Sequence, residues 1–139
     1  KWRQLSYEDC YRIANILQVP SYISFMTALL FYEVTTQVQR GFFESACLKK
    51  TARYDIKDII FNFYKLQKGL YFDFVKEGDF FIATKEKAFL DAVYLTSLGR
   101  YSFDLASLDL SKLDMKRIRK LLERFPDRTK REVKKICKI

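Results

Sequence analysis

The first third of the chain shows apolar residues in two different helical patterns. Ser6 or Asp9 can act as an N-cap for a helix with one apolar face. That face is formed by Tyr7, Cys10, Tyr11, Ala14 and Leu17. After the break at Pro20, residues 25–32 are apolar at almost every position and follow Ser24, a second candidate cap. The pattern predicts an amphipathic helix followed by a buried one, since a helix that is apolar all round must be covered on several sides.

From Thr35 onward the chain changes to short segments rich in β-branched and aromatic residues. The strand candidates are residues 38–40, 42–48, 52–56, 59–64, 70–75 and 79–83, of which 59–64 and 70–75 have the clearest pattern. Gly78 lies in a turn that is expected to join the last two as a hairpin. Helices before and after a run of strands predict an α+β fold, with a mostly antiparallel sheet packed by N-terminal, central and C-terminal helices.

Residues 80–99 predict a strand that leads directly into the central helix of the fold. They read FFIATKEKAFLDAVYLTSLG. Thr84 is a good N-cap, and Gly99 can take the left-handed conformation that ends a helix. The segment between them is apolar at most positions, so we expect it to form the core helix. Lys87 and Asp91 are an i, i+4 pair, and Asp91 needs hydrogen-bond partners if it is buried.

Two short amphipathic helices are predicted at the C-terminal end. Asp114 can cap the first, and Pro126 separates it from the second. Their apolar sides are formed by Met115, Ile118, Leu121, Leu122 and Phe125 and by Val133, Ile136 and Cys137. Their outward sides carry ten basic residues, which are Lys116, Arg117, Arg119, Lys120, Arg124, Arg128, Lys130, Arg131, Lys134 and Lys135.

The excess positive charge lies almost entirely in this helical pair. The formal net charge is +9, and residues 112–139 hold 12 of the 26 lysines and arginines but 4 of the 17 acidic residues. A basic patch of this density is typical of proteins that bind nucleic acid or another polyanion. A basic helix face that is only solvated is the common alternative, and the sequence alone leaves both interpretations open.

Composition excludes several classes of chemistry. The absence of histidine removes the Ser-His and Cys-His catalytic pairs and the usual zinc ligand. Cys10, Cys47 and Cys137 are widely spaced, which fits neither a disulfide framework nor a metal knuckle. The length favours one domain over residues 1–139, and no apolar run or leader pattern indicates a membrane segment. We therefore expect a cytoplasmic protein with no cofactor and no membrane contact.

One catalytic alternative is a metal-dependent nuclease. Glu44 followed by Asp55 and Lys57 forms an acid and Asp-x-Lys set, which could hold magnesium and a polarising lysine. Such a set occurs by chance in many chains with this number of charges, so we expect no enzymatic activity and no bound metal. A stand-alone nucleic-acid-binding module is the other alternative.

Two separated segments resemble the C-terminal domain of AbiEi-type antitoxins. Residues 20–24 read PSYIS and lead into the small apolar helix, and residues 82–91 read IATKEKAFLD and open the central helix. The family has a Tyr-Ile-Ser segment and an I-A-x-P-E-K-A-x-x-D segment in the same places. The order and spacing agree from about Asp9 to the end of the chain. Lys85 stands where the family usually has proline, and the first turn of a helix accepts either residue.

The resemblance implies a bacterial toxin–antitoxin system concerned with abortive infection, phage defence or plasmid maintenance. It implies a transcriptional regulator whose N-terminal winged-helix domain, expected upstream of this chain, binds promoter DNA. The domain seen here would oppose a nucleotidyltransferase-type toxin, with or without a stable complex. The family-matching residues are expected to be structural, and no catalytic residues carry over. They are Tyr22, Ser24, Glu86, Lys87 and Asp91.

Overall fold

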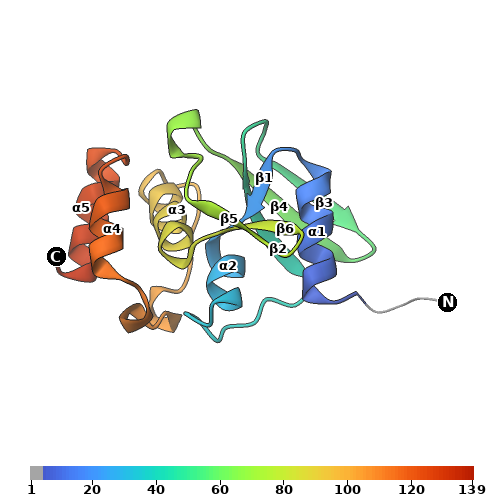
Figure 1. Ribbon diagram of the computed structural model, residues 1–139, viewed down its shortest axis with the longest axis horizontal. Coiled ribbons are helices and arrows are strands. Elements are labelled where there is room, and N and C mark those ends of the chain that lie inside the picture. Colours follow the sequence, from blue (N-terminus) through green and yellow to red (C-terminus); the bar gives the residue numbers. More distant parts are fainter. Residues whose placement is uncertain (1–4) are drawn as a thin grey trace.

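Six strands form a single mixed sheet in the order β3-β4-β2-β1-β6-β5 in the computed structural model, which describes residues 5–139 (Figure 1). The strands are β1 (Ser21–Ile23), β2 (Phe42–Cys47), β3 (Ala52–Ile56), β4 (Ile59–Lys65), β5 (Phe74–Glu77) and β6 (Phe80–Ala83). The pairs β1–β2, β3–β4 and β5–β6 are antiparallel, whereas β1–β6 and β2–β4 are parallel. The α+β class is confirmed, but the sheet is mixed, because β1–β6 and β2–β4 pair in parallel.

The helices lie on both sides of the sheet. Ser21 donates its hydroxyl to carbonyl oxygens of Ala14 and Gln18, at the end of α1 (Tyr7–Leu17), while the next residue, Tyr22, points toward α3 (Lys85–Ser97). Successive strand residues face opposite sides, so α1 and α3 cover opposite faces of β1. α2 (Phe25–Phe31) packs beside α3 (Figure 1).

The helix boundaries follow local capping signals. Ser6 and Asp9 form a reciprocal capping box at the start of α1. Thr84 accepts a hydrogen bond from the Lys87 amide at the start of α3. Gly99, at φ +72°, ends α3 in a Schellman arrangement, in which the Arg100 amide bonds the Leu95 carbonyl. The predicted core role of α3 is confirmed, because every residue from Glu86 to Leu95 is buried.

Two helices complete the fold at the end of the molecule away from α1 (Figure 1). These are α4 (Met115–Leu122) and α5 (Asp127–Cys137), and both pack on α3. Asp114 caps α4 by accepting from the amides of Lys116 and Arg117. Short 3-10 turns occupy Lys68–Leu70, Leu105–Ser107 and Leu110–Lys112. No helix of the described residues is both long and apolar enough to span a membrane.

Three strand predictions were wrong. Residues 38–40 form no strand, whereas Ser21–Ile23, for which no strand was predicted, form β1. Residues 70–75 form a strand only from Phe74 onward, because Leu70 ends a 3-10 turn and Asp73 has a left-handed backbone at φ +59°. The hairpin at Gly78 is confirmed, with Glu77 paired to Phe80.

Candidate functional site

A buried network of polar side chains joins α3 to β1. Lys87 and Asp91 lie one turn apart on α3, and both side chains are 0% exposed. Asp91 Oδ1 accepts from Lys87 Nζ at 2.5 Å, and Oδ2 accepts from the hydroxyls of Tyr22 at 2.9 Å and Ser24 at 2.7 Å. The Ser24 hydroxyl makes this bond and does not cap α2, contrary to the prediction from its position.

All three ammonium hydrogens of Lys87 have acceptors. Besides Asp91, Nζ donates to the Tyr22 hydroxyl at 2.8 Å and to the Leu70 carbonyl at 2.7 Å. It also lies 4.9 Å from the ring centre of Phe72. Burial lowers the pKa of Lys87, and the Asp91 carboxylate opposes that shift. Every member of the network is enclosed and satisfied, which is the arrangement of a structural anchor.

Glu86 connects the same helix to the C-terminal pair. Its side chain is buried, and Oε2 accepts from the Asp114 amide at 2.9 Å, at the residue that caps α4. Arg117 lies 3.7 Å from Oε1 and also bonds the Asp73 carboxylate. All five family-matching residues are therefore buried, and each holds α3 against another part of the fold.

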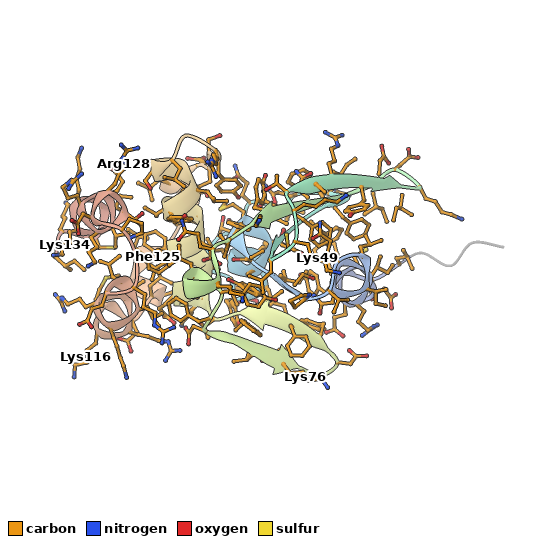
Figure 2. All side chains as sticks on the ribbon, turned by 90° about the horizontal axis from the view of Figure 1, so that it is seen from above. Lys49, Lys76, Lys116, Phe125, Arg128 and Lys134 are labelled. Carbon is orange, nitrogen blue, oxygen red and sulfur yellow. The ribbon has the colours of Figure 1, made fainter. Side chains whose placement is uncertain are left out.

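The structure places the ten basic residues of α4 and α5 around the outer side of the helical pair. Nine are exposed, and Lys130 is half-buried. In Figure 2, Lys116, Arg128 and Lys134 extend outward from the two helices, while Phe125 points into the fold. The basic residues are thus gathered at one end of the molecule, opposite buried positions such as Ile118 and Val133.

Three of the ten also make contacts with the body of the fold. Arg117 pairs with Asp73 and Glu86, Arg124 stacks over the ring of Phe72 at 4.4 Å, and Arg128 donates to the Ser97 carbonyl at 3.3 Å. A substitution at these positions would alter packing as well as charge. Lys116, Lys120, Arg131 and Lys135 are exposed and are better suited to a test of charge alone.

The proposed nuclease set is not brought together. Glu44 is buried on β2, whereas Asp55 is exposed on the edge strand β3 and Lys57 is exposed in the following turn. In the sheet, Glu44 on β2 is paired with Asn62 on β4, and Asn62 is paired with Arg53 on β3. Asp55 is two residues beyond Arg53, so the backbones of Glu44 and Asp55 are separated by two strand spacings and two residues, about 12 Å. Within residues 5–139, no three His, Cys, Asp or Glu side chains are grouped so that they could hold a metal ion.

Sequence reasoning missed one partner each of two buried charged residues, Glu44 and Lys87. Tyr101 donates its hydroxyl to Glu44, and the Leu70 carbonyl accepts from Lys87. The aromatic and apolar characters of Tyr101 and Leu70 gave no sign of these roles. Only the topology shows them, because the partners lie 57 and 17 residues away in the chain.

Comparison of the chain with family models, curated proteins and solved structures found no match. The resemblance to AbiEi-type antitoxins therefore remains a prediction that rests on the two sequence segments. What the geometry adds is how those segments lie in the fold.

Proposed function

We propose that this chain is the C-terminal antitoxin domain of an AbiEi-like transcriptional regulator that opposes a nucleotidyltransferase-type toxin. One observation carries the proposal. The two segments that resemble the family meet in one hydrogen-bond network, in which Tyr22 and Ser24 bond Asp91 across 69 and 67 residues of chain.

This contact makes the two segments a single feature. A buried carboxylate or ammonium that loses its partner is costly, so the residues of one segment require those of the other. Tyr22 and Ser24 from the first segment, with Lys87 and Asp91 from the second, leave no polar atom of the network without a partner. This coupling supports the interpretation of the two segments as one feature.

The basic outer side of α4 and α5 supports the second part of the proposal, which is assistance to promoter binding. Closely spaced lysines and arginines on adjacent helices can follow a phosphate backbone, and their affinity arises largely from the release of counterions. The same side chains are compatible with a stand-alone nucleic-acid-binding module that has no toxin partner.

Growth rescue tests the antitoxin assignment. The proposal requires a nucleotidyltransferase gene next to the gene of this protein. That toxin gene is induced in a bacterial host, with and without the full-length protein that contains this chain. We expect the toxin alone to stop growth and the full-length protein to restore it. Failure to restore growth at matched expression would refute the antitoxin assignment, and DNA binding without rescue would favour the stand-alone module.

The nuclease alternative has its own test. We expect no cleavage of DNA or RNA in magnesium, because Glu44 and Asp55 are too far apart to share an ion. Magnesium-dependent cleavage that is lost in Asp55→Asn would show that this expectation is wrong.

A further inference from the structure

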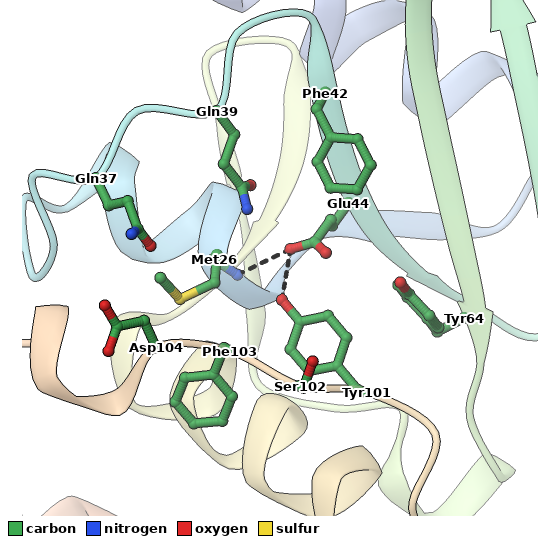
Figure 3. A pocket seen from close by; sticks show the side chains of 10 residues that line it. All are labelled: Met26, Gln37, Gln39, Phe42, Glu44, Tyr64, Tyr101, Ser102, Phe103 and Asp104. Carbon is green, nitrogen blue, oxygen red and sulfur yellow. Dashed lines mark hydrogen bonds between the residues drawn. The ribbon is translucent and has the colours of Figure 1, made fainter.

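A cavity of about 390 Å³ lies between β2, β4 and the segment that follows α3 (Figure 3). The rings of Tyr64, Tyr101 and Phe103 contribute to its walls, and Glu44, Gln39 and Asp104 supply polar groups. Its lining residues include two carboxylates but no lysine or arginine. The lining is therefore acidic in a protein whose net charge is strongly positive.

Glu44 carries the unusual feature of this cavity. Glu44 is only 2% exposed. Its Oε1 accepts hydrogen bonds from the Met26 amide at 3.2 Å and from the Tyr101 hydroxyl at 2.7 Å (Figure 3). Among residues 5–139, no hydrogen bond reaches Oε2 and no cation pairs with the carboxylate. Buried carboxylates normally have a cationic partner, and burial here raises the pKa of Glu44 to about 7.

A second acceptor lies in the same cavity. Oε1 of Gln39 is buried and has no hydrogen-bond partner within the described part of the chain. A ligand that satisfies Oε2 of Glu44 and Oε1 of Gln39 must donate hydrogen bonds. The rings of Tyr101 and Phe103 are stacked, at 6.1 Å between centres and 29° between planes, and aromatic faces favour a planar cation.

We propose that the Glu44 cavity binds a guanidinium group, from a free ligand or from an arginine side chain of a partner. A guanidinium is planar and positively charged, and it offers five N–H donors and accepts none. It stacks on aromatic rings and forms charge-assisted bonds with a carboxylate. This inference does not depend on the antitoxin assignment.

The test is a titration of the full 139-residue chain followed by NMR chemical shifts. Agmatine and a short peptide with blocked termini, whose only charged side chain is one internal arginine, are the two probes. We expect saturable shifts at Glu44, Gln39 and Tyr101 with at least one of them. Binding of agmatine indicates a free ligand, whereas binding of the peptide alone indicates a partner's side chain. Absence of saturable binding by both probes would overturn the proposal.

Matched ligands and variants separate this site from weak electrostatic attraction. Citrulline in the same peptide replaces guanidinium by neutral urea and is expected to abolish binding. Glu44→Gln keeps an acceptor for Met26 and Tyr101 but removes the charge, so we expect affinity to fall at least about tenfold at pH 8. Asp104→Asn, at an exposed position, should weaken binding by only about twofold. Equal affinity of wild type and Glu44→Gln would overturn the proposal even if a probe binds.

The pH dependence provides a further readout. Protonation of Glu44 near pH 7 removes its charge, so affinity at pH 6 is expected to be about tenfold lower than at pH 8. Burial raises the pKa of Tyr64 and Tyr101, so both stay neutral across this range. The Asp104→Asn variant should keep the pH dependence, and Glu44→Gln should lose it. A pH dependence that survives in Glu44→Gln would exclude Glu44 as the binding group.

Discussion

Lys87 has no exposed surface, yet its ammonium group has an acceptor for each hydrogen. At the residue scale this network behaves as a unit, since each member is the partner that keeps another from being buried alone. The arrangement explains why so polar a set can occupy the centre of an apolar helix. It also makes the cost of each substitution depend on what is left behind.

Removal of Lys87 tests this interdependence. Lys87→Met fills similar space but leaves Asp91 buried without its ammonium partner, so we expect the free energy of unfolding to fall by about 3–5 kcal/mol. Lys120→Met, an exposed position on α4, should change it by less than about 0.5 kcal/mol. Urea denaturation of both variants measures the difference, and similar values for the two would contradict a structural role for the network.

The buried carboxyl of Glu44 is expected to make the free energy of unfolding depend on pH. Burial raises the pKa of this carboxyl from 4.5 to about 7 in the folded chain, so between these values the folded state keeps a proton that the unfolded state loses. The contribution of Glu44 to stability therefore decreases as pH rises through this window, by about 3 kcal/mol in total. Relative to wild type, Glu44→Gln should become more stable from pH 4.5 to 8, as measured by denaturation at each pH. A difference that does not change with pH would show that Glu44 is not the titrating group.

At the scale of elements, Gly99 is expected to set the end of α3. Its φ of +72° disfavours residues with a Cβ, although no atom lies within 4 Å of the position that a Cβ would occupy. Gly99→Ala should therefore cost about 1–2 kcal/mol through backbone strain alone. Gly69→Ala is a matched control, because Gly69 has equal space and no positive φ, and it should be close to neutral. Thermal denaturation compares the two, and equal effects would argue against the cap.

The elements that the sequence predicted well are those with local signals. Ser6, Thr84, Asp114 and Gly99 mark helix ends through bonds to residues only a few positions away. β1 has no such signal, because its three residues form a strand only through pairing with β2 and β6. The apolar pattern of residues 70–75 arises from aromatic packing around Tyr22, which imitates the pattern of a strand.

The candidate site was predictable only in part. Asp91 was expected to need partners because its flanks are apolar, and this is confirmed by its three side-chain hydrogen bonds. The identity of the partners depends on the fold, since Tyr22 and Ser24 lie 69 and 67 residues before Asp91 in the chain. The Glu44 cavity was not predicted, because it combines residues from four separate segments with no common motif.

At the scale of the whole molecule, the positive charge is concentrated at the end formed by α4 and α5 (Figure 2). We expect the reversal of Lys116, Lys120, Arg131 and Lys135 to glutamate to weaken binding to a DNA duplex by about tenfold or more and to reduce its salt dependence. The control reverses Lys49, Lys50, Lys68 and Lys76, which are exposed on the body of the fold and give the same net charge. Fluorescence anisotropy at several salt concentrations measures both. Equal losses would show that total charge, and not its location, controls binding.

The same pair of variants, placed in the full-length protein, tests the central claim most directly through growth rescue. With the proposed nucleotidyltransferase-type toxin induced, we expect wild type and the Lys49, Lys50, Lys68 and Lys76 variant to restore growth. The variant with a reversed helical pair should fail although it folds and accumulates normally. If wild type itself does not restore growth, the assignment as an antitoxin domain is wrong. If the helical-pair variant rescues as well as wild type, the basic end has no part in antitoxin action, and its proposed role is confined to DNA binding.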